Sequence, residues 1–147
     1  MNDGDARYEL MGFPGAVIPF IRAMEASRLR AAADHGLSSI EFRALFAVAE
    51  TREITPKQLA SDLGVTNGAI TGLSDRLIAA GLLQREAHPG DRRSLYLTLS
   101  GRGHETMRDM HAGLNEMLSV AVEGIDPGEL ETLSAALRQV TESISAR

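Results

Sequence analysis

Residues Thr55–Leu99 read TPKQLASDLGVTNGAITGLSDRLIAAGLLQREAHPGDRRSLYLTL, and this stretch determines the fold. Its pattern predicts two helices joined by a tight turn, followed by a two-stranded ribbon. Thr55 caps the first helix, and Gly64 ends it. Thr66 caps the second helix, which ends at Gly81. Two helices joined by a short turn that contains glycine predict a helix-turn-helix unit.

The second of these helices has two different faces. Its buried side is predicted by apolar residues at helical spacing, which are Ile70, Leu73, Leu77 and Ile78. The opposite side carries small, hydrogen-bonding or charged residues, which are Thr66, Asn67, Gly68, Thr71, Gly72, Asp75 and Arg76. Each glycine costs about 1 kcal/mol of helix stability relative to alanine. Close approach to the backbone of DNA would explain that cost, and an ordinary solvated helix face is the alternative.

The ribbon that follows is predicted at 82–88 and 94–99, where apolar and polar residues alternate. The turn between the strands contains two adjacent arginines, Arg92 and Arg93. Arginine suits phosphates and narrow minor grooves, and Asp91 is placed to orient Arg93 by a charged hydrogen bond. A hairpin tip that only keeps the protein soluble is the alternative. Beside the helix pair, however, the ribbon indicates a wing that contacts DNA.

The run from Gly68 to Gly103 closely resembles the MarR family of winged-helix transcription regulators. The matching motifs are the DRL of Asp75-Arg76-Leu77, Gly81-Leu82 with Arg85, the D-x-R of Asp91 and Arg93, the L-x-L of Leu97 and Leu99, and Gly103. Chain length and helix plan extend the resemblance over nearly the whole sequence. The departures are a short wing tip, Gln84 within an apolar and basic pattern, and Ser100 where the family more often has threonine.

The resemblance implies a mainly α fold with a small β-ribbon, that is, a winged helix-turn-helix with N- and C-terminal dimerisation helices. The whole chain, 1–147, would be one domain, with the DNA-binding part at 37–101 and the dimerisation helices at 8–36 and 102–147. The implied function is that of a homodimeric, sequence-specific regulator of transcription, usually a repressor that a small aromatic or anionic ligand releases. Such a dimer would read a palindromic operator with its recognition helices about 34 Å apart.

The resemblance also assigns roles to single residues. It makes Arg93 the minor-groove arginine of the wing, and it places contacts of the second helix with DNA at its exposed N-terminal half. With the basic and polar residues nearby, the expected DNA-binding residues are Lys57, Thr66, Asn67, Gly68, Thr71, Gly72, Arg76, Asp91, Arg92 and Arg93.

Composition sets limits on other functions. The 147 residues suffice for one compact domain, and the absence of cysteine removes disulfides and thiol redox sensing. The formal net charge of −5 by itself argues against a nucleic-acid partner. Between Arg52 and Arg102, however, seven Lys or Arg residues accompany five Asp or Glu. This mildly basic segment in an acidic chain is consistent with salt-sensitive DNA binding. We expect a cytoplasmic protein, nucleoid-associated when bound to DNA, because no membrane span or signal peptide is visible.

The flanking segments predict four further helices. The first is expected at Pro19–His35, with Phe20, Met24 and Leu29 among its buried residues. A capping box at 38–41 opens a helix that runs to Thr51.

Ile54 is expected to form a short strand that pairs with the wing. A long helix is predicted from Gly101 to Glu123 with a methionine-rich apolar stripe, and a last helix begins at Asp126. The leucines of this last helix recur every three or four residues, which predicts a seam for a partner helix.

Candidates for other chemistry are few. Tyr8, Arg22 and Arg43 are candidates to hold an anionic effector, and each is equally well explained as an exposed side chain. His104 and His111 lie two turns apart on one helix, a spacing at which two imidazoles cannot chelate one ion without help from another helix. We therefore expect no metal and no cofactor. No nucleophile motif, phosphate-binding loop or acid–base pair is present, so we do not expect an enzyme.

Two alternatives to a ligand-released repressor remain open. One is a regulator that needs no ligand. A filled interior would favour this alternative, whereas an apolar pocket beside the helix-turn-helix unit would favour a ligand-released repressor. The other is a winged-helix module that binds a protein partner instead of DNA.

Overall fold

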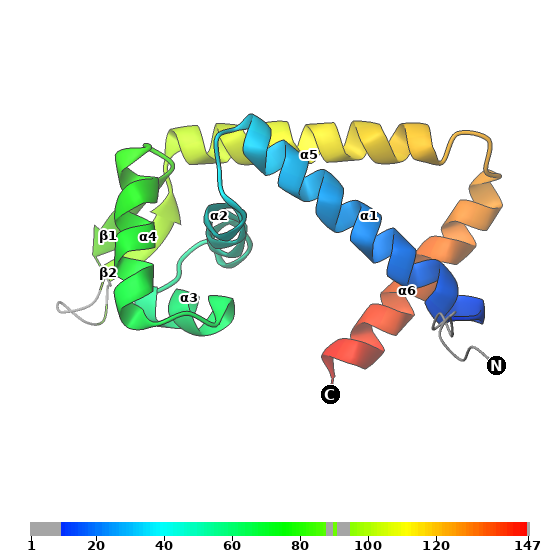
Figure 1. Cartoon of the computed structure of the whole chain (residues 1–147), viewed down its shortest axis with the longest axis horizontal. Coiled ribbons are helices and arrows are strands. Elements are labelled where there is room, and N and C mark those ends of the chain that lie inside the picture. The colour runs from blue at the N-terminus through cyan, green and yellow to red at the C-terminus, as the bar shows by residue number, and fades with distance from the viewer. Residues whose placement is uncertain (1–9, 88–89, 91–94, 147) are drawn as a thin grey trace, which may run out of the picture. The chain divides into compact units, whose positions relative to one another are not determined.

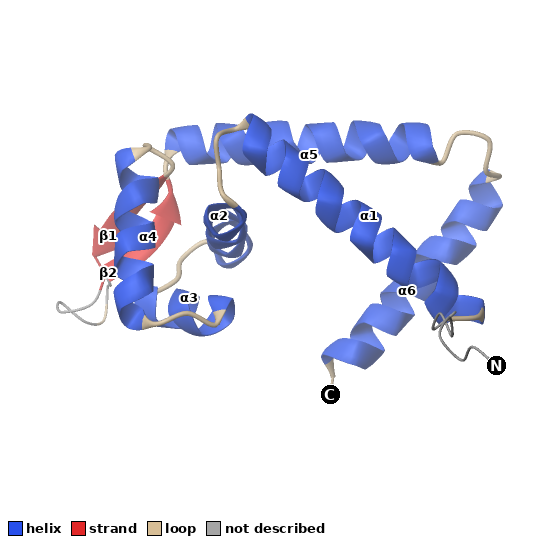
Figure 2. Cartoon of the chain, viewed as in Figure 1, coloured by secondary structure: helices blue, strands red, loops and turns tan. Residues whose placement is uncertain are grey.

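The computed structural model describes residues 10–87, 90 and 95–146 (Figure 1). Its elements are α1 (Gly12–Asp34), α2 (Ser39–Thr51), α3 (Pro56–Leu63), α4 (Asn67–Ala79), β1 (Leu83–Ala87), β2 (Leu95–Leu99), α5 (Gly101–Ala121) and α6 (Pro127–Ser145). Figure 2 shows the helices and the single two-stranded ribbon. The predicted mainly helical fold with a small wing is confirmed.

The chain divides into two compact units, Met1–Leu114 and Asn115–Arg147. The first unit contains the helix-turn-helix, the wing and α1, and the second contains α6. The arrangement of 1–147 as one domain stays a prediction.

Local capping signals position the helices of the first unit. Ser38 and Glu41 form a capping box at the start of α2, and Thr55 and Gln58 form a second one at the start of α3. In each box a side-chain hydroxyl accepts from the N–H three residues on, and the longer side chain accepts from the backbone of the cap. Both predicted helix starts are confirmed. The boxes stabilise these starts because they pair backbone N–H groups that a helix leaves without partners.

One apolar core joins α2, α3, α4 and the wing. Leu45 of α2, Leu59 of α3 and Leu77 of α4 are almost fully buried, as is Leu97 of β2. Burying a leucine side chain contributes about 1.5–3 kcal/mol to the free energy of unfolding, so this cluster holds α3 and α4 against the ribbon.

The wing is an antiparallel pair in which Leu83 lies opposite Leu99 and Ala87 lies opposite Leu95. Ile54 adds a short third segment, because its N–H and carbonyl both pair with Leu97. The predicted strand at Ile54 is confirmed. The base of the ribbon is thereby tied to the loop between α2 and α3.

The first helix differs from the prediction. A start at Pro19 was wrong, because α1 begins at Gly12 and contains Pro19 in its interior. Pro14 lies in the first turn, where a missing N–H is tolerated, and the helix continues past Pro19 at the loss of one backbone hydrogen bond.

The predicted burial of large side chains on α1 was also wrong. Phe20 and Leu29 are 49% and 46% exposed, and Met24 is only partly buried. Ala32 is the fully buried residue of this helix. Small side chains make the close contacts of α1, and its large apolar side chains stay at the surface of the single chain.

The helix that follows the wing starts at a tightly packed point. The Ser100 hydroxyl donates to the carbonyl of Gly81 and accepts from the N–H of Gly103 at 2.9 Å. A Cβ on Gly103 would lie 2.1 Å from the carbonyl oxygen of Leu82, so only glycine fits here. Met107 and Met110 of the predicted methionine stripe are buried, and α5 ends at Ala121 instead of Glu123.

In the second unit, the Asp126 carboxylate accepts from the backbone N–H groups of Gly128 and Glu129. This cap confirms the predicted start of α6.

One buried hydroxyl has no partner among the described residues, that of Ser74 on the core side of α4. We expect Ser74→Ala to raise the free energy of unfolding by about 0.5–1 kcal/mol, because it removes an unsatisfied polar atom and favours the helix. Ser100→Ala should instead lower it by about 1 kcal/mol, because it deletes a cap. Urea unfolding followed by circular dichroism measures both, and a loss of stability in Ser74→Ala would contradict the assignment.

Candidate DNA-binding surface

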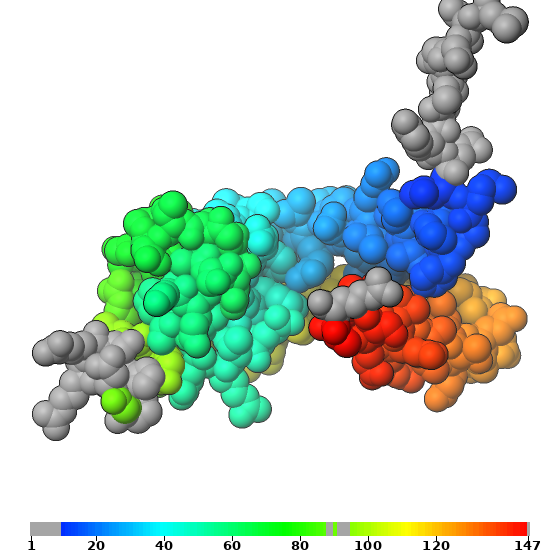
Figure 3. Space-filling model, turned by 90° about the horizontal axis from the view of Figure 1, so that it is seen from below, coloured from blue at the N-terminus to red at the C-terminus, as the bar shows by residue number. Residues whose placement is uncertain are grey.

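The turn between α3 and α4 sets the position of α4. Gly64 has φ +67° and ψ +34°, the left-handed conformation that glycine adopts without strain. The N–H of Val65 then returns to the carbonyl of Ala60, and Thr66 caps α4 by accepting from Ala69 at 3.2 Å. The chain can therefore reverse within three residues and present α4 beside α3, and both helices contribute to the face seen in Figure 3.

The exposed side of α4 is the side that the sequence predicted. Thr66, Asn67, Gly68 and Thr71 are exposed, and Gly72 is partly buried. A Cβ on Gly68 would meet nothing within 4 Å. A Cβ on Gly72 would make only an ordinary contact, 3.7 Å from Nη1 of Arg76. Neither glycine has a positive φ, so nothing in the described fold requires glycine at either position.

Two ion pairs tie the far end of α4 to its neighbours. The Arg85 guanidinium of β1 donates to Oδ1 of Asp75 at 2.5 Å. Nε of Arg76 donates to Oε1 of Glu41 at 3.1 Å, which joins α4 to α2. Hydrogen bonds from the backbone and side chain of Ser38, followed by the one from Arg76, lower the pKa of the Glu41 carboxyl. Glu41 is therefore ionised at neutral pH.

The remaining predicted contacts fall in two places. Lys57 is exposed in the first turn of α3. Asp91, Arg92 and Arg93 lie outside the described residues. The roles assigned to all these residues stay predictions.

A cavity of about 630 Å³ lies between α1, α2 and α5 in the first unit. Its walls are mainly apolar or aromatic, with Phe42, Phe46, Met110 and Leu114 among them, and Arg28, Arg30 and Asp34 are the charged residues of the lining. The Arg28 guanidinium lies over two of the rings, 5.2 Å from the centroid of Phe42 and 4.5 Å from that of Phe46. The cavity thus combines flat apolar walls with a cation, a pairing that suits an aromatic anion.

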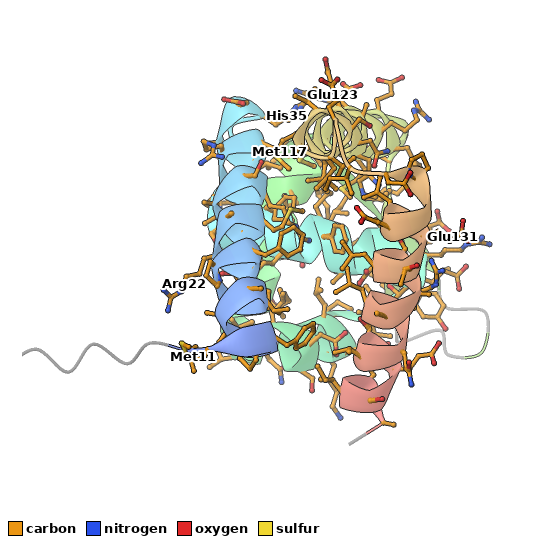
Figure 4. The ribbon with its side chains drawn as sticks, turned by 90° about the vertical axis from the view of Figure 1, so that its right-hand side faces the viewer. Met11, Arg22, His35, Met117, Glu123 and Glu131 are labelled. Carbon is orange, nitrogen blue, oxygen red and sulfur yellow. The ribbon has the colours of Figure 1, made fainter. Side chains whose placement is uncertain are left out.

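The predicted effector residues are not the ones that line this cavity. Figure 4 shows Arg22 pointing outward from α1, and Arg22 lines none of the described cavities. Arg43 lines a neighbouring, more polar hollow, and Tyr8 lies outside the described residues. Sequence reasoning missed Arg28. The pair Phe42 and Phe46, four apart on α2 and therefore on one face, could have indicated an aromatic wall, but no local signal points to Arg28 on α1.

Other kinds of site find no support in the described part of the chain. Its His, Asp and Glu side chains nowhere gather in threes as a metal site would require. None of its helices has both the length and the apolar character needed to cross a membrane.

Comparison with known proteins identifies the family. Residues 37–95 match the model of the MarR family. The HTH-type transcriptional regulator MhqR of Bacillus subtilis is 30% identical over 110 residues, which cover 72% of this chain and 73% of MhqR. The chain belongs to the MarR family. The predicted family is confirmed, and with it a DNA-binding regulator of transcription in a family that is not enzymatic.

Solved structures agree on the MarR fold. RV1404 from Mycobacterium tuberculosis superimposes with a TM-score of 0.78 at 28% identity, covering 95% of this chain and 97% of that one. A MepR mutant of Staphylococcus aureus bound to an oligodeoxyribonucleotide has a TM-score of 0.67 at 16% identity, covering 92% and 99%. At that identity the second likeness concerns the fold alone.

Proposed function

We propose that the protein is a homodimeric, cytoplasmic repressor that binds a palindromic operator and is released by a small aromatic anion. The main support for DNA binding is the exposed side of α4, where small side chains leave the space beside Gly68 empty. Gly68 and Gly72 reduce helix stability, and the fold requires neither of them. A surface that must approach base edges within the major groove explains why they are there.

A second copy of the chain is the proposed partner for the exposed apolar side chains. On α1, Phe13, Phe20 and Leu29 are each about half exposed. On α6, Leu133 is 49% and Ile144 is 69% exposed, and no residue of this helix is buried. Apolar faces of this kind mark interaction surfaces. A two-fold dimer would also place two copies of α4 for the two halves of a palindrome.

The cavity beside Arg28 supports the proposed effector. A ligand there would contact Phe42 and Phe46, and these side chains belong to the helix whose Glu41 holds Arg76 of α4. Ligand binding that favours a different position of α2 would therefore disfavour the DNA-binding arrangement of α4. A regulator that needs no ligand is the less favoured alternative, because an open, mainly apolar cavity is present.

The central test is binding of the purified protein to the intergenic DNA upstream of its own gene, at two salt concentrations. We expect specific binding by a dimer, weakened by salt, and weakened further by salicylate.

Arg93→Ala should reduce operator affinity at least tenfold, because minor-groove arginines contribute strongly to affinity. Binding no tighter than to random DNA would argue for a distant operator or a protein partner. DNA binding that survives both Arg92→Ala and Arg93→Ala would refute the role of the wing.

A size series at position 68 tests the bare face of α4. Gly68→Ala and Gly68→Leu should keep or raise the free energy of unfolding, by up to about 1 kcal/mol, because their side chains enter open space. Operator affinity should fall stepwise with side-chain size. Gly113→Ala on α5 is the control in measurements without ligand, because a Cβ there also meets nothing within 4 Å and Gly113 lines the proposed effector cavity, away from α4. It should gain similar stability without losing operator affinity. Equal operator affinity across the position-68 series would show that this face does not contact DNA.

Arg28→Met tests the effector site. Methionine keeps the length and apolar packing of the side chain but removes the cation, so operator binding without ligand should persist. The salicylate concentration that releases half of the DNA should rise about tenfold, the effect of losing a charged hydrogen bond. Arg22→Met, which alters a side chain that points outward, is the matched control and should respond as the wild type does. If Arg22→Met raised the salicylate concentration for release and Arg28→Met did not, Arg22 instead of Arg28 would hold the anion.

A further inference from the structure

The two capping boxes of the chain differ in one chemical respect. At the start of α3, a single oxygen of the Gln58 amide accepts from the Thr55 N–H at 3.0 Å and from its hydroxyl at 2.8 Å. At the start of α2, one oxygen of the Glu41 carboxylate accepts from the same two groups of Ser38 at 3.0 and 2.8 Å. The geometry is the same, so the box at α2 does not itself need a carboxylate.

The second carboxylate oxygen of Glu41 has a different partner. It accepts from Nε of Arg76 on α4, which is 35 residues away in the chain. The Glu41 side chain is 18% exposed and is fixed by its box, whereas that of Arg76 is 61% exposed. The more exposed cation is therefore held by the less exposed anion, which the capping box anchors. The carboxylate oxygen that pairs with Arg76 is thus a different one from the oxygen that the capping box uses.

The position of the guanidinium shows where it is held. Its Nη1 lies 3.7 Å from the place of a Cβ on Gly72, a partly buried position of α4 next to the exposed Thr71. With Nε engaged by Glu41, the terminal amines of Arg76 lie beside the surface proposed to face DNA. An arginine in this last turn suits a phosphate, since the N-terminal residues of a recognition helix contact the bases.

We propose that Glu41 is a positioning residue that determines the specificity of DNA binding, by holding Arg76 for one phosphate of a correctly docked operator. This inference rests on the proposed function. Phosphate contacts fix the register of a protein on DNA, and a held arginine reaches its phosphate only in the correct register. The paired carboxylate also offsets a charge that would otherwise attract any duplex, since non-specific binding is mainly electrostatic.

The variant Glu41→Gln separates the two roles of this side chain. Its amide oxygen can serve the capping box, as that of Gln58 does, so the melting temperature should stay close to that of the wild type. Its amide NH₂ cannot accept a hydrogen bond from Arg76. The probes are the tightest duplex selected by the wild type from a random-sequence pool, and a scrambled duplex of equal length.

We expect Glu41→Gln to bind the scrambled duplex about threefold more tightly and the selected duplex no more tightly. The ratio of the two affinities should therefore fall about threefold or more, an effect within the range of an exposed ion pair. The dependence of scrambled-duplex binding on log[salt] should steepen by about 0.9, one additional phosphate contact, which a merely structural defect would not cause. Glu131→Gln on α6 makes the same change in net charge and should leave the ratio unaltered.

A double-mutant cycle ties the effect to Arg76. In an Arg76→Ala background, Glu41→Gln should cause no further loss of discrimination. An unchanged ratio in Glu41→Gln, or an equal loss in the Arg76→Ala background, would overturn the role of Glu41 while leaving the proposed function intact. A wild type that does not distinguish the two duplexes would overturn the proposed function itself, and this inference with it.

Discussion

The two-sided character of α4 is the constraint on which the rest of the structure depends. Ile70, Leu73 and Leu77 must be buried, so α3 and the wing pack against that side, and α2 joins them in one core of the described residues. The opposite side must stay bare, so nothing in the described fold fills the space beside Gly68. A helix whose apolar side is packed in the core, and whose opposite side has small side chains, can enter a groove of DNA while its core contacts stay intact.

Ion pairs at the end of α4 complete this support without covering the bare side. Asp75 is paired with β1 through Arg85, and Arg76 is paired with α2 through Glu41. Exposed pairs of this kind contribute little to stability. Their value lies in orientation, because they relate α4 to the ribbon and to the helix that lines the cavity. Under the proposed function, the same link would carry a change from the cavity to the surface proposed to contact DNA.

The starts of α2, α3, α4 and α6, the turn at Gly64 and the two strands of the wing could be predicted from sequence. Each depends on residues within three or four positions of one another, as in the box of Thr55 and Gln58 or the turn at Gly64. The first helix could not be predicted in the same way. Local rules identify Pro19 as a helix start, yet α1 begins seven residues earlier, at Gly12, and continues through this proline. Its Phe20 and Leu29 fit a burial pattern, but the single chain leaves them half exposed.

The sequence by itself therefore determined the family, the order of the elements and the bare side of the recognition helix, because these follow from local propensity and apolar spacing. Only the tertiary structure revealed that Glu41 meets Arg76 across 35 residues, and that Arg28 lies over Phe42 and Phe46 beside a cavity. Such contacts depend on the angles and distances at which helices pack. Those are set by the summed fit of many side chains in the core, and no short stretch of sequence encodes them.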